Sequence, residues 1–188
     1  MGGAAPVEGV REEQMRGVVG ELWFWVGGVR PRSVSAGQHW MGPAGSRHDF
    51  QWRVHAIEAK CTTSVRGHVH WINGIEQLDP PEGGALQLFS LRIREEPSAQ
   101  NTLVSLVDRI ELHLATESEL LDLFEVRLSQ TGYSVADRQR YAETRFRVVD
   151  ERLYSVTPGF PRISVSSFPM GLPVGVETVR YEINLEST

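Results

Sequence analysis

Residues 48–60 read HDFQWRVHAIEAK, and this stretch decides the fold. We interpret it as two adjacent strands, over residues 48–54 and 55–62, joined by a tight or bulged turn near Arg53. Side chains at alternate positions of a strand point to the same face, so Glu58 and Lys60 emerge together. Ala59 points to the other face, into a core. Asp49, on the first strand, is then expected in the same small volume as Glu58 and Lys60.

These three charged side chains suit the chemistry of a metal-activated water. Ionised Asp49 and Glu58 are acceptor-only oxygen ligands that favour a hard cation such as Mg²⁺, and the carbonyl of Ala59 is a further oxygen ligand. A water held between a metal, a carboxylate and Lys60 can act as a hydrolytic nucleophile. Two neighbouring carboxylates should keep Lys60 protonated, which favours an electrostatic role over that of a general base.

An Asp, a spacer and then Glu-x-Lys resembles the signature of the PD-(D/E)XK nuclease superfamily. The sequence HDFQW, followed by HAIEAKCTTS, resembles one branch of this superfamily. That branch is the bacterial PD-(D/E)XK motif proteins found beside methyltransferases and ATPases in restriction and phage-defence gene clusters. His48 stands where the superfamily name has Pro, at a position that varies in the superfamily. The resemblance covers roughly residues 15–155 and is specific around residues 46–62.

The resemblance implies an α/β fold, with a restriction-endonuclease-like mixed β-sheet core flanked by helices. It implies a metal-dependent DNA endonuclease that hydrolyses phosphodiester bonds with Mg²⁺, for which Mn²⁺ can substitute. Glu21, Asp49, Glu58 and the Ala59 carbonyl would hold one or two ions, and Lys60 would position the attacking water. Cutting both strands of a duplex commonly needs two active sites, so we expect a homodimer or a subunit of a defence complex.

Glu21 lies in an amphipathic helix that begins near Arg11 and ends at Gly27-Gly28. The apolar residues Val18, Val19, Leu22, Trp25 and Val26 recur in it at helical spacing. A glutamate in a Gly-Glu-Leu setting of the first helix resembles the extra acidic position of many PD-(D/E)XK proteins. The alternative is a solvated glutamate on the polar face of the helix.

Length and composition indicate one globular domain, which we place at residues 11–188 after a flexible leader over residues 1–10. The chain has 188 residues, of which 40% are hydrophobic and 23% are charged. No apolar run reaches ~18 residues and no signal peptide is recognisable, so we expect no membrane association. Cys61 is the only cysteine, and a reducing cytoplasm is the natural location. The net charge of −5 argues against broad electrostatic attraction to nucleic acid.

Three further groups are candidates for binding. His68 and His70 alternate on a predicted strand over residues 67–72, where they would bind zinc or copper or simply be polar surface positions. Gln77 would orient a phosphate or a water through its amide, or make a local structural hydrogen bond. Arg138 and Arg140 belong to the densest basic run, which would contact phosphates, although acidic neighbours favour ordinary paired arginines.

The rest of the chain predicts the frame of the domain. Residues 85–94 predict a central, covered strand, and residues 101–115 predict a helix with one apolar stripe. A capping box at residues 116–119 would start a second helix that ends at Gly132. Residues 146–156 and 174–185 predict the last two strands.

Two rival interpretations stay open. In the first, the same fold is a catalytically idle DNA-binding or scaffolding subunit of a defence complex. The presence of Asp49, Glu58 and Lys60 argues against an idle subunit, and the acidic net charge argues for it. In the second, weaker one, the chain is a cupin-like metal protein that uses His48, His68 and His70.

Overall fold

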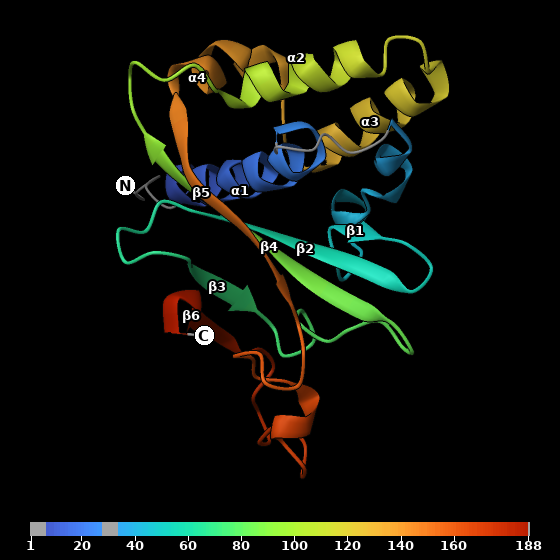
Figure 1. Cartoon of the computed structure of the whole chain (residues 1–188), viewed down its shortest axis with the longest axis vertical. Helices are drawn as coiled ribbons and strands as arrows, with labels where there is room; N and C mark the ends of the chain where they lie inside the picture. Colours follow the sequence, from blue (N-terminus) through green and yellow to red (C-terminus); the bar gives the residue numbers. More distant parts are fainter. Residues whose placement is uncertain (1–6, 28–33, 188) are drawn as a thin grey trace, which may run out of the picture.

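The computed structural model of the chain describes residues 7–27 and 34–187 (Figure 1). Of the predicted leader, residues 1–6 lie outside the described residues, whereas Val7–Leu22 form helix α1, which starts four residues earlier than predicted. The helix continues as a π-helical turn over Trp23–Gly27, and Gly28 of the predicted glycine pair lies outside the described residues. None of the helices in the described ranges is long and apolar enough to cross a membrane.

The main sheet has four strands in the order β1-β2-β4-β5. Their bounds are β1 Phe50–Gln51, β2 His55–Thr62, β4 Ala85–Glu95 and β5 Phe146–Ser155. The outer pairs are antiparallel and the central pair, β2 and β4, is parallel, so the sheet is mixed. The predicted central position of the strand at residues 85–94 is therefore confirmed, as is the strand over residues 146–156.

Helices cover one face of this sheet. In Figure 1, α1 lies against β2, and α2 (Leu103–His113) and α4 (Arg138–Glu143) lie beyond it. The third helix, α3, runs over Ser118–Gln130. Apolar side chains from alternate strand positions, such as Ile57, Phe89 and Leu91, form one core with these helices. Ala59 belongs to the same core, as predicted.

The opposite face of the main sheet carries a small antiparallel sheet of β3 (Val69–Asn73) and β6 (Arg180–Asn184). A second core of mostly aliphatic side chains fills the space between the two sheets; it includes Ala56, Leu86, Leu88, Ile72 and Ile183. Because side chains alternate along a strand, Glu58 and Lys60 lie on the face of Ala56, toward the small sheet. The sequence therefore places the charged pair between the two sheets rather than under the helices.

Three predicted local details are wrong. The first strand of the hairpin covers only Phe50–Gln51 of the predicted 48–54, because the backbone carbonyl of Asp49 accepts from Met41 and Gly42 instead of joining a ladder. The last strand covers only Arg180–Asn184 of the predicted 174–185, which is the part that pairs with β3. Helix α3 has Glu117 as its N-cap with no side-chain capping bond, so the capping box at residues 116–119 is absent.

Candidate metal-dependent hydrolytic site

The short first strand leaves one edge of β2 open where the site forms. β1 pairs with β2 only through Phe50↔Ile57 and Gln51↔Ala56. One step further on, the backbone N–H of Ala59 donates instead to Oδ2 of Asp49 at 2.7 Å. The N–H and C=O of one strand residue point to the same side, so the Ala59 carbonyl faces this edge as well. Asp49 thus substitutes for a strand partner and is held at the edge of β2.

Glu58 and Lys60 form a buried ion pair beside this edge. The Nζ atom of Lys60 lies 2.9 Å from Oε1 of Glu58. Glu58 is only 2% exposed, and its second oxygen, Oε2, has no hydrogen-bond partner among the described residues. A buried carboxylate oxygen without a hydrogen-bond partner costs free energy. Such an atom in a native protein is explained by a bound water or ion.

Glu21 reaches the same place from α1. The Nε1 atom of Trp40 donates a hydrogen bond to Oε2 of Glu21 at 2.6 Å. The preceding residue, Gly20, lies so close to β2 that an added Cβ would be 3.0 Å from the Cβ of Cys61. The glycine before Glu21 therefore lets the helix approach the strand closely enough to deliver the carboxylate.

The pKa values of the three carboxylates are all raised, in each case mainly by burial. Burial, and then the charge of Asp49, raises the pKa of Glu58 to about 8. Burial raises the pKa of Asp49, and burial together with Asp49 raises that of Glu21 well above its ordinary value. Burial would lower the pKa of Lys60, but attraction to Glu58, Asp49 and Glu21 outweighs it and raises the pKa. Lys60 is therefore a cation, and the cluster still lacks positive charge.

A model of one protein family matches residues 6–186, and the description of that family is "Putative PD-(D/E)XK family member, (DUF4420)". The chain belongs to this family. No curated protein and no solved structure matches the chain. The mixed sheet with its flanking helices agrees with the PD-(D/E)XK fold.

The side chains of this PD-(D/E)XK family member fit a divalent cation by three criteria. Their donors are carboxylate and carbonyl oxygens, which hard cations prefer. Oε2 of Glu58 is buried without a partner, and the raised pKa values indicate unbalanced negative charge. In the present arrangement Lys60 neutralises Glu58, and no three described His, Cys, Asp or Glu side chains are close enough together to hold an ion.

Gly42 forms part of the cradle around the carboxylates. A Cβ added at this position would lie 2.6 Å from Oδ1 of Asp49 and 3.3 Å from Oε2 of Glu21. Its backbone N–H and that of Met41 both donate to the Asp49 carbonyl, at 3.1 and 2.7 Å. The glycine thus leaves space in front of two of the three acids while its backbone fixes one of them.

We expect Gly42→Ala to displace Asp49 and to weaken divalent-metal binding at least about tenfold, because the new methyl group would overlap the carboxylate. Isothermal titration with Mn²⁺ measures this loss. Gly159→Ala is the matched control, because nothing lies within 4 Å of a Cβ added there. Equal Mn²⁺ affinity in the two variants would contradict the placement of Asp49.

The three carboxylates line a cleft of about 640 Å³ that lies between α1, the end of β2 and the small sheet. Glu21, Asp49, Glu58, Ala59 and Lys60 all line it, and so does Gln77. The Oε1 atom of Gln77 accepts from the backbone N–H of Asn73 at 2.9 Å, which is the local structural bond considered as one alternative. Its side-chain NH₂ group is a separate donor, so the ligand-binding alternative stays a prediction.

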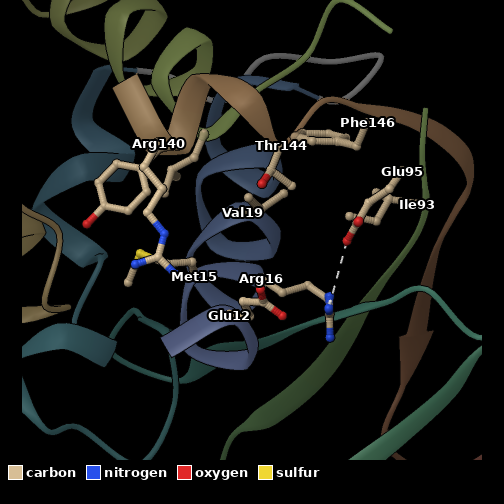
Figure 2. A pocket seen from close by; sticks show the side chains of 11 residues that line it. Glu12, Met15, Arg16, Val19, Ile93, Glu95, Arg140, Thr144 and Phe146 are labelled. Carbon is tan, nitrogen blue, oxygen red and sulfur yellow. Dashed lines mark ion pairs between the residues drawn. The ribbon is translucent and has the colours of Figure 1, made fainter. Parts of the chain in front are cut away.

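Arg138 and Arg140 lie away from the cleft, on α4. Arg138 pairs with Asp108 at 2.5 Å. Arg140 lines a separate cavity of about 140 Å³ that also includes Met15, Glu12 and Phe146 (Figure 2). The structure thus does not bring the two arginines together with the carboxylates, and a role for them in substrate binding stays a prediction about another surface.

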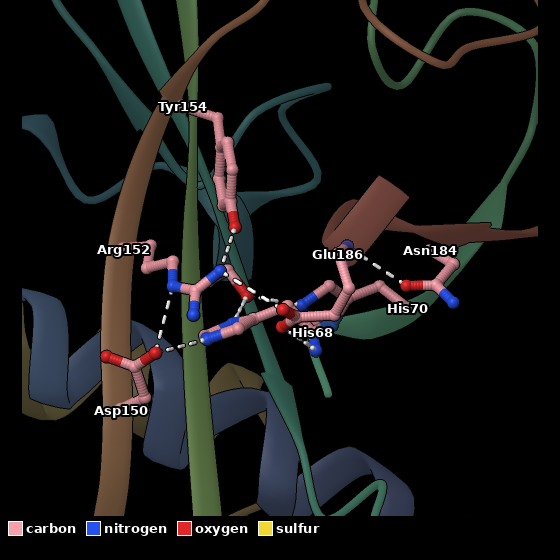
Figure 3. Close-up of polar contacts among 8 residues, drawn as sticks. His68, His70, Asp150, Arg152, Tyr154, Asn184 and Glu186 are labelled. Carbon is pink, nitrogen blue, oxygen red and sulfur yellow. Dashed lines mark hydrogen bonds and ion pairs between the residues drawn. The ribbon is translucent and has the colours of Figure 1, made fainter. Parts of the chain in front are cut away.

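His68 and His70 belong to a buried polar network between the two sheets (Figure 3). Nδ1 of His68 and Nε2 of His70 both lie 2.5 Å from Oγ of Ser90, and Nε2 of His68 lies 3.1 Å from Oδ2 of Asp150. Both ring nitrogens of His68 are therefore in use, which leaves it no lone pair for a metal. This finding argues against the zinc or copper pair and against the cupin-like interpretation.

Sequence reasoning missed Ser90 as the centre of this network. The only signal was a serine between the apolar residues Phe89 and Leu91 of β4, at the position that pairs with Lys60. The hydroxyl has one proton, so it donates to one imidazole and accepts from the other. His70 lines the cleft, and burial lowers its pKa to about 3, so its imidazole is neutral near pH 7. The network thus fixes β3 against β4 and shapes one wall of the cleft.

We expect Ser90→Ala to lower the free energy of unfolding by about 2–4 kcal/mol, because two buried imidazole nitrogens lose their partner. Urea denaturation followed by circular dichroism measures the change. Ser129→Ala, which removes an exposed hydroxyl bonded to the Val126 carbonyl, serves as the control and should change stability by less than about 1 kcal/mol. An equally small effect at Ser90 would contradict the network.

Proposed function

We propose that this chain is a metal-dependent endodeoxyribonuclease that hydrolyses phosphodiester bonds. One observation carries the proposal. Asp49 and Glu58 lie at one sheet edge with Lys60 beside them, and all three line the same open cleft. Membership of the PD-(D/E)XK family supports the assignment, because nucleases of that superfamily use an acid pair and a lysine in this order.

The proposal assigns metal binding to Glu21, Asp49, Glu58 and the Ala59 carbonyl, and names Mg²⁺ as the ion, with Mn²⁺ as a substitute. When bound, the ion would supply Lewis acidity and lower the pKa of a coordinated water. The protein contributes the rigid part of the site. Asp49 is fixed by the Ala59 N–H, and Glu21 is fixed by the indole of Trp40, so neither has to be reorganised before reaction.

Lys60 has the electrostatic role in this proposal. Its ammonium lies against Glu58, and its raised pKa keeps it charged at neutral pH. A fixed cation at this position can hold the attacking water by hydrogen bonding and can stabilise the negative charge that develops on the phosphoryl oxygens. A general-base role would need the neutral amine, which the surrounding acids disfavour.

We further propose bacterial restriction or phage defence as the setting and DNA as the partner, with the chain acting as a homodimer or as a subunit of a defence complex. The resemblance of the motif to the defence-associated branch supports this setting. The rival is an idle nuclease fold that binds DNA or scaffolds a complex, for which the net charge of −5 is the favouring observation. An idle site has no need to retain the unpartnered Glu58 oxygen and its lysine.

Plasmid nicking separates the two functions. Supercoiled DNA incubated with the protein and Mn²⁺ should become nicked or linear, and EDTA should stop the reaction. Gel-shift binding in EDTA is measured in parallel, and the Asp49→Asn protein is the inactive reference. Binding without cleavage at any metal concentration would reject the nuclease and favour the idle subunit.

A further inference from the structure

The outer face of the small sheet carries an exposed aromatic side chain beside the cleft. On β3, His70 and Ile72 are buried toward the main sheet, whereas Trp71 between them points outward and is 48% exposed. The structure describes all five tryptophans of the chain, and Trp71 is the most exposed of them. A half-exposed indole offers a large, rigid aromatic surface to a ligand.

Arg180 lies over the ring of Trp71. Its guanidinium carbon is 4.6 Å from the centroid of the indole, a cation–π distance, and its Nη2 donates to Oε1 of Glu13 on α1 at 3.0 Å. The ion pair with Glu13 joins the two walls of the cleft, because Glu13 and Arg180 both line it. Trp71 and Arg180 thus form a platform in which the guanidinium lies over the indole, and the ion pair with Glu13 ties this platform to α1.

The platform opens onto the same cleft as the hydrolytic cluster. Trp71 and Arg180 line it together with Glu58 and Lys60. A ligand whose phosphate lies at Glu58 and Lys60 therefore has an aromatic surface within the same cavity for its neighbouring group. In nucleic acids, the group next to a phosphate that stacks on an indole is a base.

We propose that Trp71 and Arg180 form a stacking site for an unpaired nucleobase, and that the substrate is therefore single-stranded or locally unpaired DNA. The inference deepens the proposed nuclease function and rests on it for the choice of DNA as the ligand. In an intact duplex every base is already stacked and paired, and only an extruded base can reach such a platform.

Charge supports the same choice. The chain has a net charge of −5, so it lacks the broad basic surface by which proteins hold duplex phosphates. Arg180 is already paired with Glu13, which reduces its pull on a phosphate. Base stacking does not depend on net charge and tolerates any sequence, so it can supply the affinity that electrostatics does not.

The test is a binding titration of the whole chain in EDTA, where no cleavage interferes. Tryptophan fluorescence is recorded while a 12-nucleotide oligothymidine or a duplex of the same length is added. We expect quenching by the single strand at concentrations at least about fivefold lower than by the duplex. Trp71→Ala should abolish most of the quenching and weaken single-strand binding at least about fivefold, and Trp71→Phe should retain part of the affinity.

Leu112→Ala is the matched control, because Leu112 is another exposed apolar side chain, on α2. It should bind the single strand as the wild type does. The inference is overturned if duplex and single strand bind equally, or if Trp71→Ala keeps wild-type affinity, even when the wild type cleaves DNA. Trp71-dependent binding of the single strand without any cleavage in Mn²⁺ supports the stacking site and rejects the proposed nuclease instead.

Discussion

Lys60→Ala is expected to reduce the rate of DNA cleavage at least about a hundredfold to a thousandfold, which is the loss seen when one fixed donor to developing charge is removed. The variant removes the single ammonium that contacts Glu58 at 2.9 Å and leaves the three carboxylates in place. Cleavage of supercoiled plasmid in saturating Mn²⁺ measures the change, because high metal compensates for any weaker ion binding.

Two control variants keep this result interpretable. Lys60→Met retains most of the side-chain volume without the charge, so it should be as inactive as Lys60→Ala if the charge is what matters. Arg53→Ala removes a positive charge from an exposed loop of the same hairpin and should leave the rate unchanged. Circular dichroism checks that each variant is folded. A folded Lys60→Met protein with wild-type cleavage would remove Lys60 from the mechanism.

The second large effect concerns stability. Glu58→Gln is expected to make the metal-free protein more stable than wild type at pH 8.5, by at most on the order of 5 kcal/mol. Burial and Asp49 raise the pKa of Glu58 from 4.5 to about 8. A raised carboxyl pKa contributes stability that is complete below the unfolded-state pKa and is lost as the pH rises through the folded-state pKa. The wild type therefore loses this contribution between about pH 4.5 and 8, and Glu58→Gln does not.

Urea denaturation in EDTA at several pH values measures this difference. The difference between variant and wild type should be small near pH 4.5 and should grow until about pH 8. Glu82→Gln makes the same charge change at an exposed site, and its stability should follow the wild type within about 0.5 kcal/mol. Added Mg²⁺ should stabilise the wild type more than Glu58→Gln, because the ion replaces the missing positive charge. A difference in unfolding free energy that stays constant across the pH range would mean that the pKa of Glu58 is not raised in the metal-free protein.

The two predictions together describe a site that sacrifices stability for function. Burial and the charge of Asp49 raise the pKa of Glu58, and Glu58 in turn helps to raise that of Glu21. A neutral glutamine at position 58 removes the cost of a charge at this buried position. The same substitution removes a proposed metal ligand. A more stable and less active Glu58→Gln protein is the signature of an active site, whereas a merely structural ion pair would lose stability when its acid is replaced.

Much of the fold follows from local patterns. The alternation of residues 55–62 placed Glu58 and Lys60 on one face and Ala59 on the other, because the side chains of a strand alternate regardless of its surroundings. The apolar residues on both faces of residues 85–94 correctly indicated a central strand, since a strand covered on both faces needs apolar side chains on both. These are properties of one segment, and a short window of sequence contains them.

The candidate site needed more than local patterns. Asp49 reaches Ala59 because β1 begins only at Phe50, and this start depends on hydrogen bonds from Met41 and Gly42 to the Asp49 carbonyl. Glu21 meets Trp40 because Gly20 lets α1 approach β2. The helical periodicity showed that Glu21 lies in a helix. It did not show which way Glu21 faces, because the packing of the helix against the sheet decides that.

The sequence by itself determined the acid, the acid-x-lysine triplet and the strand that presents them, because a two-residue period needs no tertiary partner. Only the tertiary structure decided what shares the cleft with them. Ser90 joins His68 and His70 across two sheets, and Arg180 meets Trp71 although more than a hundred residues separate them along the chain. Such contacts depend on how β3 and β6 pack against the main sheet, and that arrangement results from the summed burial of a whole core rather than from any local pattern.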